Sequence, residues 1–179
     1  MSDLEDKFRK VYESGIWGKP WHSGQGSTEE EFTAYLDYIV PFIEKGEYKS
    51  ILDYGSGDGR VLASLASRLP ACRFTGYDIV SEWTSRNAEA IPGIEWTATE
   101  PDLSKFDLIL CKDVIHHLPY AMIEDLLAKF ACGPAILITA DFKIGGVPAD
   151  WEGRDVFAGL DLSSVSDLTS LVLVAPGDE

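Results

Sequence analysis

The chain has little of what membrane proteins and disulfide-rich secreted proteins need. No apolar run approaches the roughly 20 residues of a membrane-spanning helix, and the start, Met-Ser-Asp-Leu-Glu-Asp-Lys, lacks the apolar core of a secretory signal. Only three cysteines occur, widely spaced, so neither a disulfide framework nor a Cys-x-x-Cys metal knuckle is available. We therefore expect a cytoplasmic protein without membrane contact, with free and mostly buried thiols at Cys72, Cys111 and Cys132.

Positive charge is also scarce. The 179 residues contain 15 Lys and Arg against 30 Asp and Glu, which gives a net charge of −15 at pH 7. Because clustered cations dominate binding to a phosphate backbone, this balance argues against nucleic acid as a partner. No metal is expected either, since His22, His116 and His117 do not form a ligand spacing with a helical i, i+4 partner.

What is present is an ordinary globular composition with alternating strand and helix patterns. With 45% hydrophobic and 25% charged residues, the 179-residue chain is expected to form a single domain. The patterns predict strands at 51–53, 73–77, 94–97, 106–111, 135–140 and 168–174, with only a weak strand or turn candidate at 155–158. This alternation predicts an α/β, doubly wound and mostly parallel sheet, whose last strand is expected to be antiparallel.

Helix signals fall between these strands. An amphipathic start reaches Tyr12, and 15–26 has the composition of a loop. A helix capped by Ser27 or Thr28 is expected to run to about Lys45, kinked or interrupted at Pro41. Further helices are predicted at 61–69, 81–90 and 120–131.

The stretch Ile51-Leu-Asp-Tyr-Gly-Ser-Gly-Asp-Gly-Arg60 joins an apolar strand to a glycine-spaced turn and a helix. In an open α/β sheet, such a turn lies where ligands bind, beyond the carboxyl end of the first strand. Its spacing is Gly-x-Gly-x-Gly, whereas a dinucleotide fingerprint needs Gly-x-Gly-x-x-Gly. Because Asp53 and Asp58 make the loop acidic, it suits a ligand with a cationic or amino-bearing part and no phosphate.

These residues resemble a known family, the class I S-adenosylmethionine-dependent methyltransferases. Asp53-Tyr-Gly-Ser-Gly-Asp-Gly59 is similar to the family's first signature, acidic-x-Gly-x-Gly-x-Gly, at every position. Asp78, at the end of the second expected strand, matches the acidic residue that binds the ribose hydroxyls. The run Phe106-Asp-Leu-Ile-Leu-Cys-Lys-Asp-Val-Ile-His-His-Leu-Pro119 resembles the fourth-strand signature of small-molecule methyltransferases. The resemblance covers roughly 51–140 and implies a Rossmann-like fold with S-adenosyl-L-methionine as cofactor.

The resemblance also implies roles for individual residues. Gly55 and Gly57 would let the backbone pass close to the methionine portion and ribose, and Asp53 would help to hold the ligand's amino group. Asp78 would bind the ribose, and Ile79 would pack on the adenine. The expected cofactor-binding residues are Asp53, Tyr54, Gly55, Ser56, Gly57, Asp78, Ile79, Thr97, Cys111 and Lys112. The residue for the adenine amino group stays open among Thr97, Thr99, Glu100 and Asp102.

The acceptor side is less constrained, because methyl transfer needs a base only when the acceptor must lose a proton. Asp113 and His117 are the candidate catalytic residues, with His116 as a weaker one, and helix capping or packing before Pro119 is an equal explanation for both histidines. Other residues expected to border the site are Tyr12, Trp17, Trp21, Asp141 and Phe142, each with packing or loop entry as its rival explanation. In this view 1–46 forms a lid and acceptor side, and 47–179 forms the cofactor-binding core.

Three functions remain in view. The first is a methyltransferase acting on a small molecule or on an exposed sugar or peptide group. The second is a module of the same fold that binds S-adenosylmethionine or S-adenosylhomocysteine without catalysis. The third is a nicotinamide-dependent oxidoreductase, which fits the alternation but needs another glycine spacing. The oligomeric state is left open.

Overall fold

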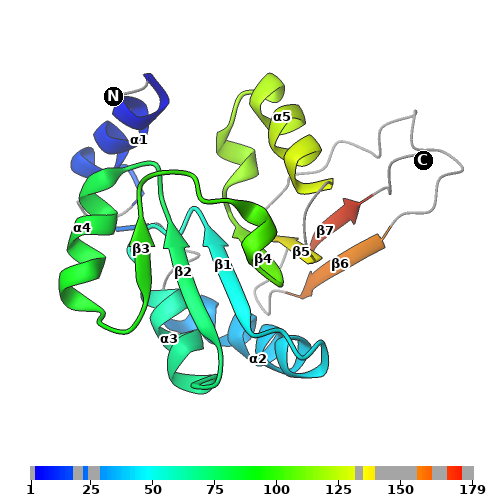
Figure 1. Ribbon diagram of the computed structural model, residues 1–179. Coiled ribbons are helices and arrows are strands. Elements are labelled where there is room, and N and C mark those ends of the chain that lie inside the picture. Colours follow the sequence, from blue (N-terminus) through cyan, green and yellow to red (C-terminus); the bar gives the residue numbers. More distant parts are fainter. Residues whose placement is uncertain are drawn as a thin grey trace, which may run out of the picture.

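The computed structural model describes residues 3–17, 22–23, 29–131, 135–139, 157–162 and 169–174. One five-stranded sheet has the order β3-β2-β1-β4-β5, and each of its pairings is parallel. Its strands are β1 (Ser50–Tyr54), β2 (Arg73–Tyr77), β3 (Glu95–Thr97), β4 (Leu108–Lys112) and β5 (Ala135–Thr139). The helices around it are α1 (Asp3–Ser14), α2 (Glu29–Lys45), α3 (Arg60–Arg68), α4 (Ser81–Ala90) and α5 (Tyr120–Ala131) (Figure 1). The predicted alternation and the mostly parallel sheet are therefore confirmed.

The expected antiparallel last strand is not a member of this sheet. The predicted segment does form a strand, β7 (Thr169–Val174), but it pairs antiparallel with β6 (Phe157–Leu162) in a separate two-stranded sheet. The weak candidate at 155–158 thus marked the start of a longer strand. The two strands satisfy each other's backbone groups, a long-range pairing that the pattern of neither segment specifies.

Successive side chains of the central strands point to opposite faces of the sheet, so each strand contributes to two cores. On one face, Ile51 of β1 packs in a cluster with residues of α2 and α3. On the other, Leu52 packs with Leu126 and Phe130 of α5. The near-continuous apolar runs of these strands therefore reflect burial on both sides.

Pro41 lies inside α2 and does not interrupt it. A proline in a helix lacks the N–H that would bond the carbonyl four residues earlier. Here the buried stripe of Leu36, Ile39 and Ile43 holds the helix against the sheet on both sides of the proline. Packing therefore outweighs the lost hydrogen bond. Among the helices of the described residues, none combines the length and apolarity that spanning a membrane requires.

The order of the strands reverses between β1 and β4, the place where open α/β sheets bind their ligands. The glycine-rich loop leaves the carboxyl end of β1, and the segment Asp113–Leu118 leaves that of β4. In Figure 1, α1 and α5 lie above this edge of the sheet, on either side of it. The fold thus brings these four parts of the chain to the point that the sequence singled out.

Candidate functional site

A cavity of about 730 Å³ lies at the carboxyl ends of β1, β2 and β4. Its walls come from α1, the glycine-rich loop, the end of β2, the segment after β4 and α5. Such a volume is in the range of small-molecule and cofactor sites.

Hydrogen bonds fix the glycine-rich loop to the end of β2. The N–H groups of Gly55 and Ser56 both donate to the carbonyl oxygen of Tyr77, at 2.7 and 2.9 Å. The N–H of Gly57 donates to Oδ2 of Asp78 at 2.9 Å. The loop is therefore held in one shape by its neighbour in the sheet.

Two glycines of the loop are required by the protein's own packing. Gly55 and Gly57 have φ angles of +86° and +50°, a region that side chains disfavour. A Cβ atom on Gly55 would stand 2.3 Å from Cγ2 of Val114, and one on Gly57 would stand 2.2 Å from Oγ of Ser23. The segment after β4 and the N-terminal segment therefore pack directly against the loop.

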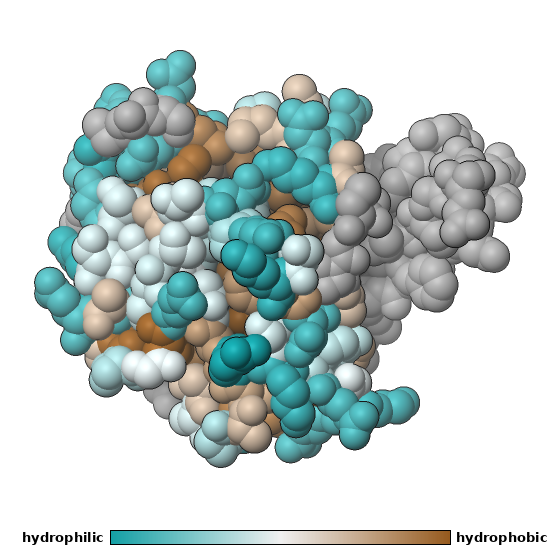
Figure 2. Space-filling model, viewed as in Figure 1, coloured by the Kyte–Doolittle hydropathy of each residue, from teal (hydrophilic) through white to brown (hydrophobic). Residues whose placement is uncertain are grey.

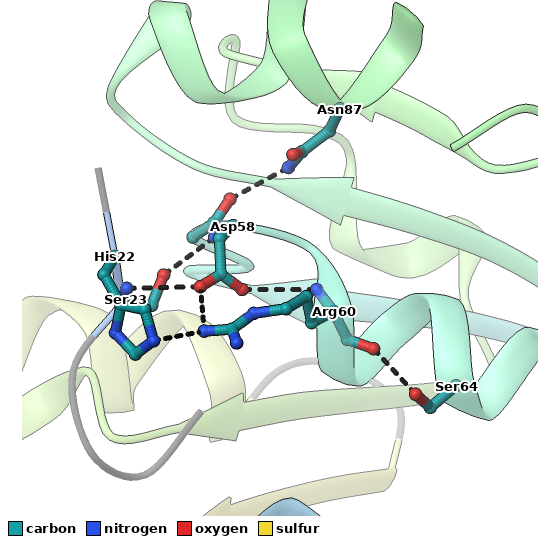
Figure 3. A network of polar contacts seen from close by, with 7 residues as sticks. His22, Ser23, Asp58, Arg60, Ser64 and Asn87 are labelled. Atoms are coloured by element: carbon teal, nitrogen blue, oxygen red, sulfur yellow. Dashed lines mark hydrogen bonds and ion pairs between the residues drawn. The ribbon is translucent and has the colours of Figure 1, made fainter. Parts of the chain in front are cut away.

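Asp58, the acidic residue inside the loop, binds protein groups (Figure 3). Its Oδ1 accepts from the N–H of Arg60, the first residue of α3, at 3.3 Å, and its Oδ2 accepts from the Arg60 guanidinium at 2.7 Å. That guanidinium also lies 2.8 Å from Nε2 of His22. Asp58 therefore occupies the positive end of α3, where a dinucleotide fold would place a phosphate. This geometry supports the prediction of a ligand without phosphate.

Asp53 and Asp78 are carboxylates buried on the cavity wall, 7% and 4% exposed. Burial raises the pKa of Asp53 to about 7, although nearby Lys112 lowers it in part. Burial also raises the pKa of Asp78 to about 6, against the hydrogen bonds from Val80 and Gly57. The bond from the N–H of Val80 to Oδ1 of Asp78 measures 2.9 Å, so each carboxylate oxygen of Asp78 accepts one backbone bond.

The segment after β4 carries the candidate catalytic residues. Asp113 has a φ of +55°, a strained conformation of a kind that clusters at functional sites, and it forms an ion pair with Lys112. The ring of His117 lies 4.8 Å from that of Trp17. Burial, and then the charge of His116, lower the pKa of His117 to about 4, so its imidazole is neutral at pH 7. Of the two histidines, His117 lines the cavity and exposed His116 does not.

A third polar group links the loop after β3 to α5. The Tyr54 hydroxyl donates to Oε1 of Glu100 at 2.7 Å, and Nζ of Lys129 binds both oxygens of the same carboxylate at 2.7 and 3.0 Å. Burial, and then Glu100, raise the pKa of the Tyr54 phenol far above its usual range. Of the open candidates after β3, Glu100 is the one that lines the cavity.

The structure brings most of the predicted site residues together. The predicted residues that line the cavity are Asp53, Tyr54, Gly55, Ser56, Gly57, Asp78, Ile79, Lys112, Asp113 and His117.

Thr97 and Cys111 do not line the cavity. The Thr97 hydroxyl bonds the backbone of Thr99, at 2.9 Å to its carbonyl and 3.0 Å to its N–H. Cys111 is fully buried in the apolar cluster under α5, which raises the pKa of its thiol. Cys111 was expected to line the methionine end with its backbone, but it is not part of the cavity wall. Its side chain lies on the face of the sheet that α5 covers, because side chains alternate along a strand. Trp21, Asp141 and Phe142 lie outside the described residues.

Sequence reasoning missed several residues of the wall. Ser23 lines the cavity and contacts the glycine-rich loop, although it stands in a stretch that reads as loop. Leu4 and Phe8 line it together with Tyr12. Their spacing of four residues, one face of a helix, was the available signal. Within the described residues, no group of three His, Cys, Asp or Glu side chains is arranged to hold a metal ion.

Several solved structures share this fold. The 1,6-didemethyltoxoflavin-N1-methyltransferase of Burkholderia thailandensis, with bound 1,6-didemethyltoxoflavin and S-adenosylhomocysteine, has a TM-score of 0.66 and 16% identity over 98% of this chain and 88% of that chain. The N-methyltransferase NodS from Bradyrhizobium japonicum, in complex with S-adenosylhomocysteine, has a TM-score of 0.64 and 18% identity over 94% and 98%. The plantazolicin methyltransferase BpumL, in complex with a monoazolic desmethyl analogue and S-adenosylhomocysteine, has a TM-score of 0.58 and 18% identity over 77% and 58%.

The sequence itself matches a protein family. No curated protein sequence matches the chain significantly. Residues 52–132, however, match the family described as "Methyltransferase domain". This match runs from β1 past α5 and includes the glycine-rich loop, Asp78 and the segment after β4. Residues 52–132 are therefore similar to a methyltransferase domain, and the chain has the fold of these S-adenosylhomocysteine-bound methyltransferases.

Proposed function

We propose that the protein is an S-adenosylmethionine-dependent methyltransferase that acts on a small molecule or on an exposed sugar or peptide group. The observation that carries the proposal is the pair of buried carboxylates, Asp53 and Asp78, on the wall of one cavity beside a rigid glycine-rich loop. The family match over residues 52–132 supports it. So do the structural neighbours that hold S-adenosylhomocysteine, the product of the cofactor.

The residues on the wall fit this cofactor. It has no phosphate, and Asp58 already fills the helix end that would bind one. A carboxylate oxygen accepts two hydrogen bonds, so each oxygen of Asp78 keeps a lone pair for a ribose hydroxyl. Asp53 would hold the amino group, Ile79 would pack on the adenine, and Lys112 would border the methionine end.

When bound, S-adenosylmethionine supplies a methyl group on a positively charged sulfur. The chain's own contribution is mainly positioning, because in-line transfer depends on the approach of the acceptor. The loop through Gly55 and Gly57 fixes one partner. Asp113 and His117 lie on the same cavity wall and would take a proton from an acceptor that must lose one.

We also propose a division of labour along the chain. Residues 1–46 form a lid and acceptor side, supported by Leu4 and Phe8 on the cavity wall. Residues 47–179 form the cofactor-binding core. A cytoplasmic location is supported by the free thiols of Cys72 and Cys111, since reducing compartments keep thiols free.

Calorimetric titration with S-adenosylhomocysteine tests the cofactor site. We expect binding by the wild type and at least about tenfold weaker binding by Asp53→Asn and Asp78→Asn, because each loses a charge-assisted contact. Asp37→Asn is the matched control, since Asp37 is exposed on α2 and pairs with Arg68. No binding at millimolar ligand would reject the proposal.

Turnover is a separate question from binding. Transfer of a labelled methyl group to any member of an acceptor panel, lost in Asp78→Asn, would establish the enzyme. Binding of the cofactor with no transfer across the panel would favour the non-catalytic module instead.

A further inference from the structure

Part of the cavity wall is apolar and aromatic. We call Phe8, Trp17 and His117 the aromatic wall, because their rings contact one another. Ring centroids are 4.8 Å apart for Trp17 and His117, 6.2 Å for Phe8 and Trp17, and 6.3 Å for Phe8 and His117. Leu4 and Met122 add aliphatic surface to the same cavity. Figure 2 shows apolar residues gathered between the positions of α1 and α5, with hydrophilic residues around them.

The aromatic wall is separate from the residues that we assign to the cofactor. Those residues lie at the carboxyl ends of the strands or directly after them, whereas Leu4, Phe8 and Trp17 belong to the N-terminal segment. The aromatic wall is therefore the surface that remains for an acceptor. Flat rings bind such surfaces by stacking and edge contacts.

The charges on the cavity wall exclude one class of acceptor. Among the described residues that line the cavity, the only Lys or Arg side chains are Lys112 and Lys129. Each forms an ion pair, Lys112 with Asp113 and Lys129 with Glu100. Carboxylates outnumber these cations, because Asp53, Asp78 and Asp125 line the cavity as well. A phosphate or carboxylate on the acceptor would be desolvated beside like charges, which is costly.

We propose, on the basis of the methyltransferase function above, that the acceptor is a flat, uncharged ring compound with an N–H or O–H group, bound against Phe8, Trp17 and His117. The acceptor nitrogen or oxygen forms the bond to the methyl carbon, and the carbon–sulfur bond breaks with its electron pair left on sulfur. The acceptor atom is then positively charged, and its proton passes to the neutral imidazole of His117. Attachment of the methyl group makes that proton acidic, so a weak base suffices.

Two probes of the same shape test the charge preference. Indole-3-carboxamide and indole-3-carboxylate differ in charge but not in outline, and each is titrated into the full chain saturated with S-adenosylhomocysteine. We expect the carboxamide to bind at least about tenfold more tightly. Equal or tighter binding of the carboxylate, or no binding of either compound at millimolar concentration, would overturn the inference.

Variants locate the binding surface. Trp17→Ala and Phe8→Ala are each expected to weaken the carboxamide by about fivefold or more, since each removes a ring from the wall. Tyr120→Ala is the matched control, because Tyr120 is an aromatic residue of α5 that is 87% exposed and does not line the cavity. Unchanged affinity in Trp17→Ala would overturn the inference.

The same experiment separates this inference from the proposed function. Binding of S-adenosylhomocysteine is measured first for every variant. A chain that does not bind it contradicts the methyltransferase assignment. A chain that binds it normally but shows no preference for the neutral ring contradicts the acceptor class alone.

Discussion

Two hydrogen bonds join Ser23 and Asp58. The N–H of Asp58 donates to Oγ of Ser23 at 2.8 Å, and the N–H of Ser23 donates to Oδ2 of Asp58 at 3.2 Å. The two residues are 35 positions apart, so the pair ties the N-terminal segment to the glycine-rich loop (Figure 3). Ser23 lines the cavity, and Asp58 directly follows Gly57, which lines it too, so the glycine-rich loop is held by a contact from the proposed lid.

Removal of the Ser23 hydroxyl should therefore affect both stability and binding. We expect Ser23→Ala to lower the free energy of unfolding by about 1 kcal/mol, because the N–H of Asp58 loses its partner. S-adenosylhomocysteine should bind several-fold more weakly, as measured by calorimetry. The control is Ser64→Ala, since the Ser64 hydroxyl donates to the Arg60 carbonyl of its own helix, at 2.9 Å. Equal affinity in both variants would show that the contact does not position the loop.

The close approach of Gly57 to Ser23 gives a second prediction. In Gly57→Ala, the new methyl group meets Oγ of Ser23 and the φ of +50° is strained, so we expect a loss of at least about 2 kcal/mol in unfolding free energy. Gly93→Ala is the matched control: Gly93 also has a positive φ, +90°, but apart from its chain neighbours no described residue lies within 4 Å of its Cβ position. It should lose about 1 kcal/mol. The double change Ser23→Gly with Gly57→Ala should recover part of the difference in thermal unfolding. A Gly57→Ala variant no less stable than Gly93→Ala would contradict the clash.

The strands and the glycine-rich loop were predictable because their signals are local. Apolar runs specify buried strands, and three glycines within five residues specify a turn whatever lies elsewhere. The direction of a side chain near a strand end was not predictable, so the adenine-binding residue stayed open among Thr97, Thr99, Glu100 and Asp102. Of these four, Glu100 is the one that lines the cavity. A prediction of Glu100 needed the positions of Tyr54 and Lys129, which come from other elements.

Contacts between distant segments were equally hidden. The partner of Asp58 lies 35 residues away, in a stretch whose composition indicates only a loop. The pairing of β6 with β7 was likewise not predictable, because neither segment's sequence pattern indicates its partner strand. Sequence patterns thus located the glycine-rich loop but not the contacts that hold it in place.

The pKa of His117 tests whether this side chain is buried in the aromatic wall. Its pKa lies near 4 in the folded chain, below the usual 6.5, because burial disfavours the charged form. An NMR titration of the His117 ring should therefore have its midpoint near pH 4. The sign for stability follows: the contribution of neutral His117 is complete above pH 6.5 and is lost as the pH falls through 4.

Removal of the Trp17 ring should raise the pKa of His117 back toward its usual value. In Trp17→Ala the ring of His117 gains solvent, so the midpoint should move upward toward 6.5, whereas Tyr120→Ala should leave it unchanged. A wild-type midpoint near 6.5 would mean that His117 is not buried against Trp17.

The raised pKa of Asp53 predicts that cofactor binding depends on pH. Its pKa is raised to about 7 by burial, so the carboxyl group is partly protonated in the free protein at neutral pH. A ligand ammonium group favours the ionised form, and binding is therefore coupled to loss of a proton. We expect the affinity for S-adenosylhomocysteine to fall as the pH is lowered from 8 to 6.5, by up to about tenfold per pH unit once the pH is below the pKa.

Calorimetry in buffers of different ionisation enthalpy should show proton release near pH 7. Asp53→Asn should bind weakly with a much shallower slope, since Asp78, with a pKa of about 6, titrates mostly below this range. Asp37→Asn should keep the wild-type slope. A flat wild-type profile would place the amino group away from Asp53, because a carboxylate in contact with it cannot titrate without changing the affinity.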